Sequence, residues 1–203
     1  MSEVNSTTAG DEAAAVDALL DAFDQVANGN AHLLQAPDRP GELPVRFRRF
    51  VRSRAFKRLL CESDLRRGWG NFQCHDVQGR PIRRAGSFYA GGQIEFDAAL
   101  SVPAFTASLR ELLDQGPCWY GHRLPPEQVR DLVEHFLRAC PPDRDQVLSV
   151  RPDFLHSHDY LNRHGGTPAD PSAICYFHGC GADHCFTWLW EDRLLVLLLN
   201  GTS

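Results

Sequence analysis

Residues 186–200 read Phe-Thr-Trp-Leu-Trp-Glu-Asp-Arg-Leu-Leu-Val-Leu-Leu-Leu-Asn, and this stretch near the C-terminus decides the fold class. Two runs of aromatic and aliphatic residues, Phe186 to Trp190 and Leu194 to Asn200, flank the charged turn Glu191-Asp192-Arg193. That pattern is typical of a β-hairpin. Six consecutive apolar residues, from Leu194 to Leu199, are too few to span a membrane and favour a strand covered on both faces. We therefore predict that the hairpin lies inside a sheet.

Other short runs with strand character precede the hairpin. They are bounded by Pro, Gly, Asp and Asn, the residues that commonly end strands. The expected strands are Val147 to Val150 and Ala173 to Phe177, with a weaker hairpin formed by Ser87 to Tyr89 and Gln93 to Phe96.

Four segments show the three-to-four-residue apolar spacing of helices. They are Asp11 to Ala27, Val45 to Leu60, Val102 to Gln115 and Pro126 to Cys140. Ser101 is placed to cap the third helix, and Gly29-Asn30 is expected to end the first. We interpret Gln35 to Pro44 as a loop between helices.

The order of these elements predicts an α+β fold, with four helices and a mostly antiparallel sheet formed largely by the C-terminal third. A curved-sheet, cone-like architecture would accommodate that order. We expect one domain over residues 11–203, preceded by a disordered N-terminal arm at residues 1–10.

Composition favours a soluble cytoplasmic protein of bacterial type. Apolar residues make up 43% of the 203, enough for a core, and no stretch approaches the length of a membrane helix. Only one of the 21 basic residues is a lysine, as in a GC-rich coding sequence. The seven cysteines cannot all pair with one another, so we expect free or metal-bound thiols rather than a disulfide framework.

Five metal- or redox-capable side chains fall within eleven residues: Cys175, His178, Cys180, His184 and Cys185. Thiolate and imidazole are the ligands that zinc prefers. Cys175, His178, Cys180 and His184 would be the ligands, with Cys185 as a substitute. A complete site in so short a loop would be crowded, so His156 or His158 could instead supply part of the ligand set.

A thiol-based active site is the second interpretation of this run. Cys180 lies between two glycines and is the best nucleophile candidate, with His156, His158 or His184 as the base and Asp159 or Asp183 as the orienting group. We expect Cys180 and Cys185 to be alkylated before Cys140, which lies on a helical apolar stripe. The competing interpretation is structural, since free cysteine is often a small core residue. We expect no cofactor, with zinc as the alternative.

Charge is distributed unevenly along the chain. Residues 45–84 hold twelve basic and three acidic side chains, a net +9, whereas the whole chain carries −5. This predicts an anionic partner or pairing with the protein's own carboxylates, for example those of the first predicted helix: Asp11, Glu12, Asp17, Asp21 and Asp24. The acidic balance elsewhere favours a protein partner over nucleic acid. The candidate partner-binding residues are Arg46, Arg49, Arg52 and Lys57.

No phosphate-binding glycine loop, nucleophile elbow or metalloprotease helix motif occurs in the sequence. We therefore expect a non-catalytic protein that binds another macromolecule, of the neutralising (immunity) type or an adaptor. The alternative is a thiol- or zinc-dependent hydrolase centred on residues 175–185.

Overall fold

The computed structural model describes residues 9–27, 29–68, 94–115, 123–143, 146–155 and 183–201. These ranges contain five α-helices: α1 (Ala9–Ala27), α2 (Leu43–Val51), α3 (Arg54–Arg66), α4 (Val102–Gln115) and α5 (Pro126–Ala139). They also contain five strands: β1 (Asn30–Pro37), β2 (Phe96–Leu100), β3 (Val147–Val150), β4 (His184–Trp190) and β5 (Arg193–Asn200). No helix in the described ranges is long and apolar enough to cross a membrane.

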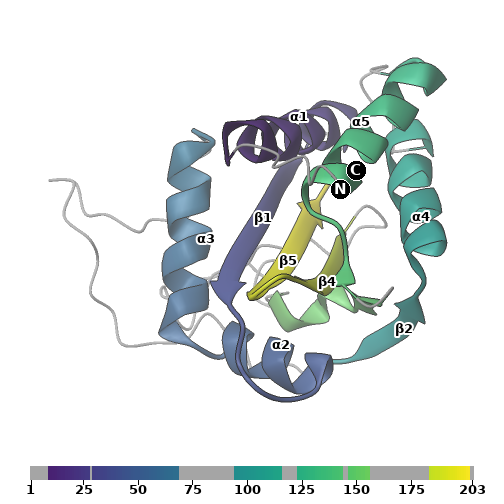
Figure 1. Cartoon of the computed structure of the whole chain (residues 1–203). Helices are drawn as coiled ribbons and strands as arrows, with labels where there is room; N and C mark the ends of the chain where they lie inside the picture. The colour runs from purple at the N-terminus through teal and green to yellow at the C-terminus, as the bar shows by residue number, and fades with distance from the viewer. Residues whose placement is uncertain are drawn as a thin grey trace, which may run out of the picture.

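The five strands form one antiparallel sheet in the order β1-β5-β4-β3-β2, so the predicted α+β class is confirmed. The C-terminal hairpin pairs Trp190 with Arg193 and lies inside the sheet, as the sequence predicts. Strands β1 and β2 form the two edges, and the sheet is open (Figure 1). Helices cover both of its faces, so the sheet is not the cone that the element order suggested.

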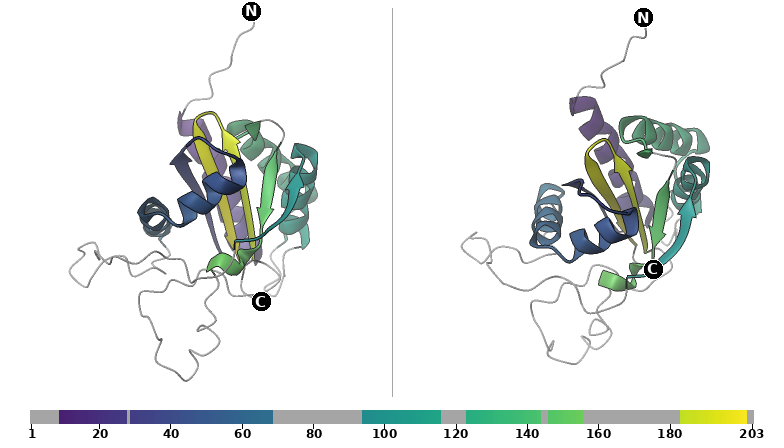
Figure 2. Two further views of the ribbon diagram at one scale, coloured as in Figure 1. Left: turned by 90° about the horizontal axis from the view of Figure 1, so that it is seen from below. Right: turned by 60° about the horizontal axis from the view of Figure 1, so that its bottom comes forward.

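Alternate residues of β5 belong to two separate cores. Leu195, Leu197 and Leu199 pack with α1, α4 and α5 on one face of the sheet. Leu194, Val196 and Leu198 pack with α2 and α3 on the other. Figure 2 shows these two helical layers with the hairpin (yellow) between them. A strand that faces helices on both sides can carry apolar residues without interruption, which explains the apolar run.

Strand β1 is an element that the sequence did not predict. The chain from Asn30 to Pro37 pairs residue by residue with β5, and α2 starts at Leu43, so only Asp38 to Glu42 of the expected loop remain irregular. At the other edge, β2 starts at Phe96 and pairs with β3, where we expected a strand ending at Phe96. The expected strands Ala173 to Phe177 and Ser87 to Tyr89 lie outside the described residues, as does most of the N-terminal arm.

The single helix predicted from Val45 to Leu60 is two helices, which makes five where four were expected. Ser53 has an extended backbone, and its hydroxyl accepts a hydrogen bond from the Phe56 N–H at 3.3 Å. Serine competes with the helix for backbone hydrogen bonds and therefore favours a cap over an interior position. The resulting bend lets both helices bury aromatic side chains, including Phe47 and Phe56, against the same face of the sheet.

A cluster of buried polar groups ties α1, β1 and α3 together. The guanidinium of Arg67, just after α3, donates to Asp21 at 3.0 Å and also to Asp24. Asp24 in turn accepts from the Ala31 N–H at 2.6 Å. Burial raises the pKa of Asp24, and the hydrogen bond from Arg67 works in the opposite direction. The carboxylates of Asp21 and Asp24 on α1 thus pair with Arg67. Arg67 belongs to the basic stretch of residues 45–84, but it follows α3 and is not part of α2.

The burial of Leu197, which has no exposed surface, gives the first prediction. Replacing Leu197 by Asp should unfold the domain, because an unpaired buried carboxylate costs several kcal/mol against a total stability of about 5–15 kcal/mol. The matched control is Leu65→Asp, since Leu65 is 47% exposed, and it should change stability by about 0.5 kcal/mol or less. Urea unfolding followed by circular dichroism measures both, and equal effects would show that β5 is not core.

His32 on β1 gives a pH-dependent prediction. Its ring is fully buried, and burial, followed by the charges of Arg67 and Arg66, lowers its pKa from 6.5 to about 3. Below pH 6.5 the unfolded chain therefore binds a proton that the folded protein excludes. Stability is full above that pH and falls by up to about 1.4 kcal/mol per pH unit as the pH drops toward the folded pKa.

We expect His32→Gln to remove this contribution. The stability difference between the natural protein and the variant should shrink as the pH falls from about 7 to about 5. Urea unfolding over that range checks it, and a difference that stays constant with pH would contradict the assignment.

Candidate functional site

Most of the Cys/His run predicted as a metal or catalytic site lies outside the described residues. Cys175, His178 and Cys180 fall there, and so do His156 and His158. His184 and Cys185 are described, as the first two residues of β4. Within the described ranges, no group of three or more His, Cys, Asp or Glu side chains is arranged to hold a metal ion.

Cys185 is a core residue in the structure. It is 1% exposed, packs in the cluster between the sheet and α2–α3, and burial raises the pKa of its thiol well above 9.0. Cys140 is also buried, and desolvation raises its pKa to about 12. Both cysteines are free. The side chain of Cys185 thus points into the core, which favours the structural interpretation of this cysteine over early alkylation.

Alkylation of the native protein tests this placement. The shift of Cys140 from 9.0 to about 12 reduces its thiolate fraction roughly a thousandfold, and burial further restricts access for both thiols. We expect Cys140 and Cys185 to stay unmodified by iodoacetamide in the folded protein and to react after denaturation, as measured by peptide mass spectrometry. Fast labelling of either one before unfolding would contradict the packing.

The basic residues on and next to α2 and α3 divide into two groups. Arg46 is committed to the fold: it is half-buried, donates to both carboxylate oxygens of Asp38, and also bonds the Gly41 carbonyl. Arg48 lies 4.7 Å from the centre of the Phe96 ring and thereby connects α2 to β2. Such cation–π contacts are structural rather than available to a partner.

The second group is exposed to solvent. Arg49, Arg52, Arg54 and Arg58 are exposed, whereas Lys57 is half-buried. Arg58 makes only a long contact, 3.8 Å, to Glu62 on the same helix, and pairs this exposed contribute little. We define the basic face as the exposed residues Arg39, Arg49, Arg52, Arg54 and Arg58.

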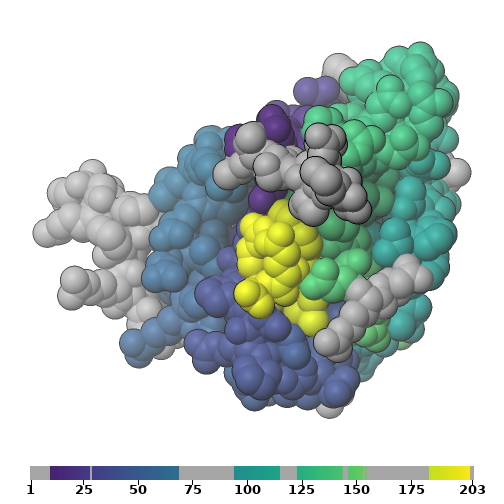
Figure 3. Space-filling model, viewed as in Figure 1, coloured from purple at the N-terminus to yellow at the C-terminus, as the bar shows by residue number. Residues whose placement is uncertain are grey.

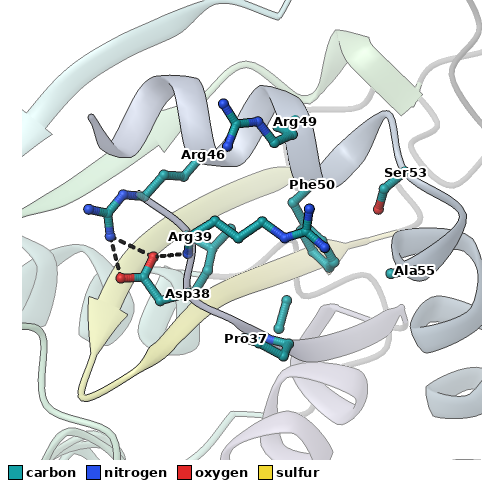
Figure 4. A pocket seen from close by; sticks show the side chains of 10 residues that line it. Pro37, Asp38, Arg39, Arg46, Arg49, Phe50, Ser53 and Ala55 are labelled. Atoms are coloured by element: carbon teal, nitrogen blue, oxygen red, sulfur yellow. Dashed lines mark hydrogen bonds and ion pairs between the residues drawn. The ribbon is translucent and has the colours of Figure 1, made fainter. Parts of the chain in front are cut away.

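A pocket of about 100 Å³ opens on this basic face, where the end of β1 meets α2 and the start of α3. Its apolar lining is Ala36, Pro37, Phe50, Ala55 and Leu194. Its polar lining is Asp38, Arg39, Arg46, Arg49 and Ser53. Figure 4 shows the Arg39 side chain extending across the pocket from the loop after β1, with Ser53 and Ala55 on the far side, while Arg49 projects from α2 with its guanidinium directed away from them. Figure 3 shows α2 at the surface below the tip of the hairpin.

The pocket is electropositive. Its lining contains three arginines and one carboxylate, Asp38, which already accepts two bonds from Arg46 and one from the Arg39 backbone N–H at 2.7 Å. Among the described residues, the guanidinium groups of Arg39 and Arg49 contact no acidic side chain. Ser53 is the N-cap of α3, and the helix dipole adds positive potential at that end of the helix. The arrangement suits an anion.

A larger hollow of about 540 Å³ lies along the outer edge of β1, between α1 and α3. Acidic and basic side chains both line it, Glu12, Asp17 and Glu62 among the acids, so it favours neither sign of charge. Ser63 lines it too, and its hydroxyl lies 3.0 Å from Nδ1 of His32. That serine–imidazole pair is not a nucleophile and base, because a histidine with a pKa of about 3 is too weak a base at neutral pH.

Comparisons of this chain with family models, with curated proteins and with solved structures find no match. The kind of ligand that the pocket binds is therefore inferred from the residues that line it.

Two of the four predicted partner-binding residues, Arg46 and Arg49, line the pocket, whereas Arg52 and Lys57 do not. That any of the four binds a partner stays a prediction. Arg39 and Ser53 were missed, because their contribution depends on β1 and on the break between α2 and α3. A serine inside a helical pattern was the available signal for that break.

Proposed function

We propose that this chain is a non-catalytic, cytoplasmic binding protein whose basic face holds an acidic segment of another protein, as a neutralising (immunity-type) protein or an adaptor would. The observation that carries the proposal is the electropositive pocket with two arginines, Arg39 and Arg49, that contact no acid among the described residues. Arginine suits this role because its planar fork binds carboxylates through two parallel hydrogen bonds.

The apolar stripe of α2 supports a protein-binding role over a nucleic-acid one. Phe47 and Phe50 are buried in the core and present no aromatic platform on which bases could stack. The rest of the chain, outside residues 45–84, carries −14, which repels a long polyanion such as duplex DNA. A short acidic segment avoids that repulsion. No described residue supports the thiol- or zinc-dependent hydrolase, whose Cys180 lies outside the described ranges.

Binding of labelled decaglutamate, measured by fluorescence anisotropy, tests the proposal against labelled duplex and single-stranded oligonucleotides. We expect the peptide to bind at about 50 mM salt and to weaken at about 200 mM, as exposed ion pairs require. Oligonucleotides should bind more weakly than the peptide at both salt concentrations. Tighter oligonucleotide binding with a steep salt dependence would overturn the proposal.

Two triple variants locate the binding face. Arg52→Gln/Arg54→Gln/Arg58→Gln removes three exposed charges from the basic face, and we expect it to weaken peptide binding about tenfold or more. The control, Arg110→Gln/Arg130→Gln/Arg138→Gln, removes the same charge from α4 and α5 on the opposite side of the sheet. An equal loss in both variants would show that net charge alone, not this face, governs binding.

A further inference from the structure

We propose that the pocket at the junction of β1, α2 and α3 is a receptor for a single glutamate side chain, which anchors the acidic segment on the basic face. This inference rests on the proposed function and names the group that the pocket selects. The volume of the pocket, its positive charge and its apolar floor each restrict which ligand can bind there.

Size excludes a cofactor or a nucleotide. The pocket measures about 100 Å³, whereas sites for drug-sized ligands occupy roughly 300–1,000 Å³. A space this small holds one side chain or one small ion. The occupant is therefore part of a larger partner or an isolated anion.

The positively charged groups around the pocket favour an anion, and their positions determine where it would bind. Arg39 and Arg49 both line the pocket, and the start of α3 faces it through Ser53 and Ala55. In Figure 4 the Arg39 side chain extends toward Phe50 and Ala55, whereas the Arg49 guanidinium points along α2, away from Ser53 and Ala55. The backbone N–H groups of Arg54 and Ala55 lie ahead of the first intrahelical hydrogen bond, and within the described residues no hydrogen bond uses them. The Arg39 guanidinium and the Ala55 backbone N–H are donors that one carboxylate can use with its two oxygens, and the charge of Arg49 adds positive potential.

The neighbouring carboxylate does not compete for these donors. Asp38 uses its oxygens on Arg46 and on the Arg39 backbone N–H, and these bonds hold the loop that carries Arg39. The backbone of the loop that carries Arg39 is thus held in place before a ligand arrives, which reduces the ordering cost of binding.

The apolar floor favours glutamate over an isolated phosphate. Phe50 and Leu194 are at most 7% exposed and form the base of the pocket with Ala36. A phosphate is polar on every side and would lose hydration against this floor. The two methylenes of glutamate instead gain contact there. Aspartate has one methylene fewer, so burial of the extra group predicts about fourfold tighter binding of glutamate.

The test compares decaglutamate with decaaspartate, which carry the same charge. We expect the natural protein to bind decaglutamate about fourfold more tightly in fluorescence anisotropy. Arg39→Gln/Arg49→Gln should lower affinity for both peptides and bring the ratio close to one. The control Arg52→Gln/Arg58→Gln removes the same charge from the same face outside the pocket, and should lower affinity while keeping the ratio.

A second variant leaves every charge in place. Ala55→Leu adds three carbon atoms to a residue that lines the pocket, and leucine is well tolerated in a helix. We expect it to abolish the glutamate preference while thermal melting stays cooperative. If Ala55→Leu does not fold, the arginine pair and its control decide the result.

The outcomes separate this inference from the function on which it rests. Absence of binding to either peptide would overturn the proposed function and the receptor together. Equal binding of both peptides by the natural protein, or a preference that survives Arg39→Gln/Arg49→Gln, would overturn the receptor alone. Inorganic phosphate that competes better than glutarate, with competition lost in the same variant, would make the pocket a phosphate site and would also overturn it.

Discussion

The burial of β5 on both faces is the constraint on which the rest of the structure depends. Seven of its eight residues are buried, and alternate side chains serve opposite cores. Such a strand needs a neighbour on each edge and a layer of helices on each face. β1 and β4 are its two neighbours in the sheet, α1, α4 and α5 form one helical layer, and α2 and α3 form the other. The tight pairing extends to Gly29, where any side chain would collide with the Asn200 carbonyl.

The same constraint places the basic face. Because α2 and α3 must both cover one face of β5, the chain breaks at Ser53 and turns its apolar sides inward. The arginines between those apolar positions then point to solvent. The acids of α1 cannot reach most of them, since α1 lies in the opposite layer, and they pair instead with Arg67 and, through Glu12, with Arg193. Binding of a partner through the positive charge of α2 and α3 is the proposal that follows from this arrangement.

The sequence predicts the parts of this fold that have a strong local signal. Ser101 caps α4 as expected, with its hydroxyl 3.4 Å from the Ala104 N–H, and α5 starts at Pro126 as expected. Strand β1 could not be predicted in this way, because Asn-Ala-His-Leu-Leu-Gln-Ala-Pro has neither alternation nor β-branched residues. Pairing with β5 makes it a strand. The pocket combines residues from β1, two helices and β5, so no single stretch of sequence reveals it.

The most direct test of this account is a nuclear magnetic resonance titration of the protein with decaglutamate. If the acidic segment is anchored in the pocket, the backbone amide signals of Arg54 and Ala55 and the side-chain Nε signals of Arg39 and Arg49 should shift most. Amides of α4 and α5, in the opposite layer, should stay in place. Shifts that spread evenly over all exposed arginines, or that concentrate on the hollow beside β1, would contradict the account.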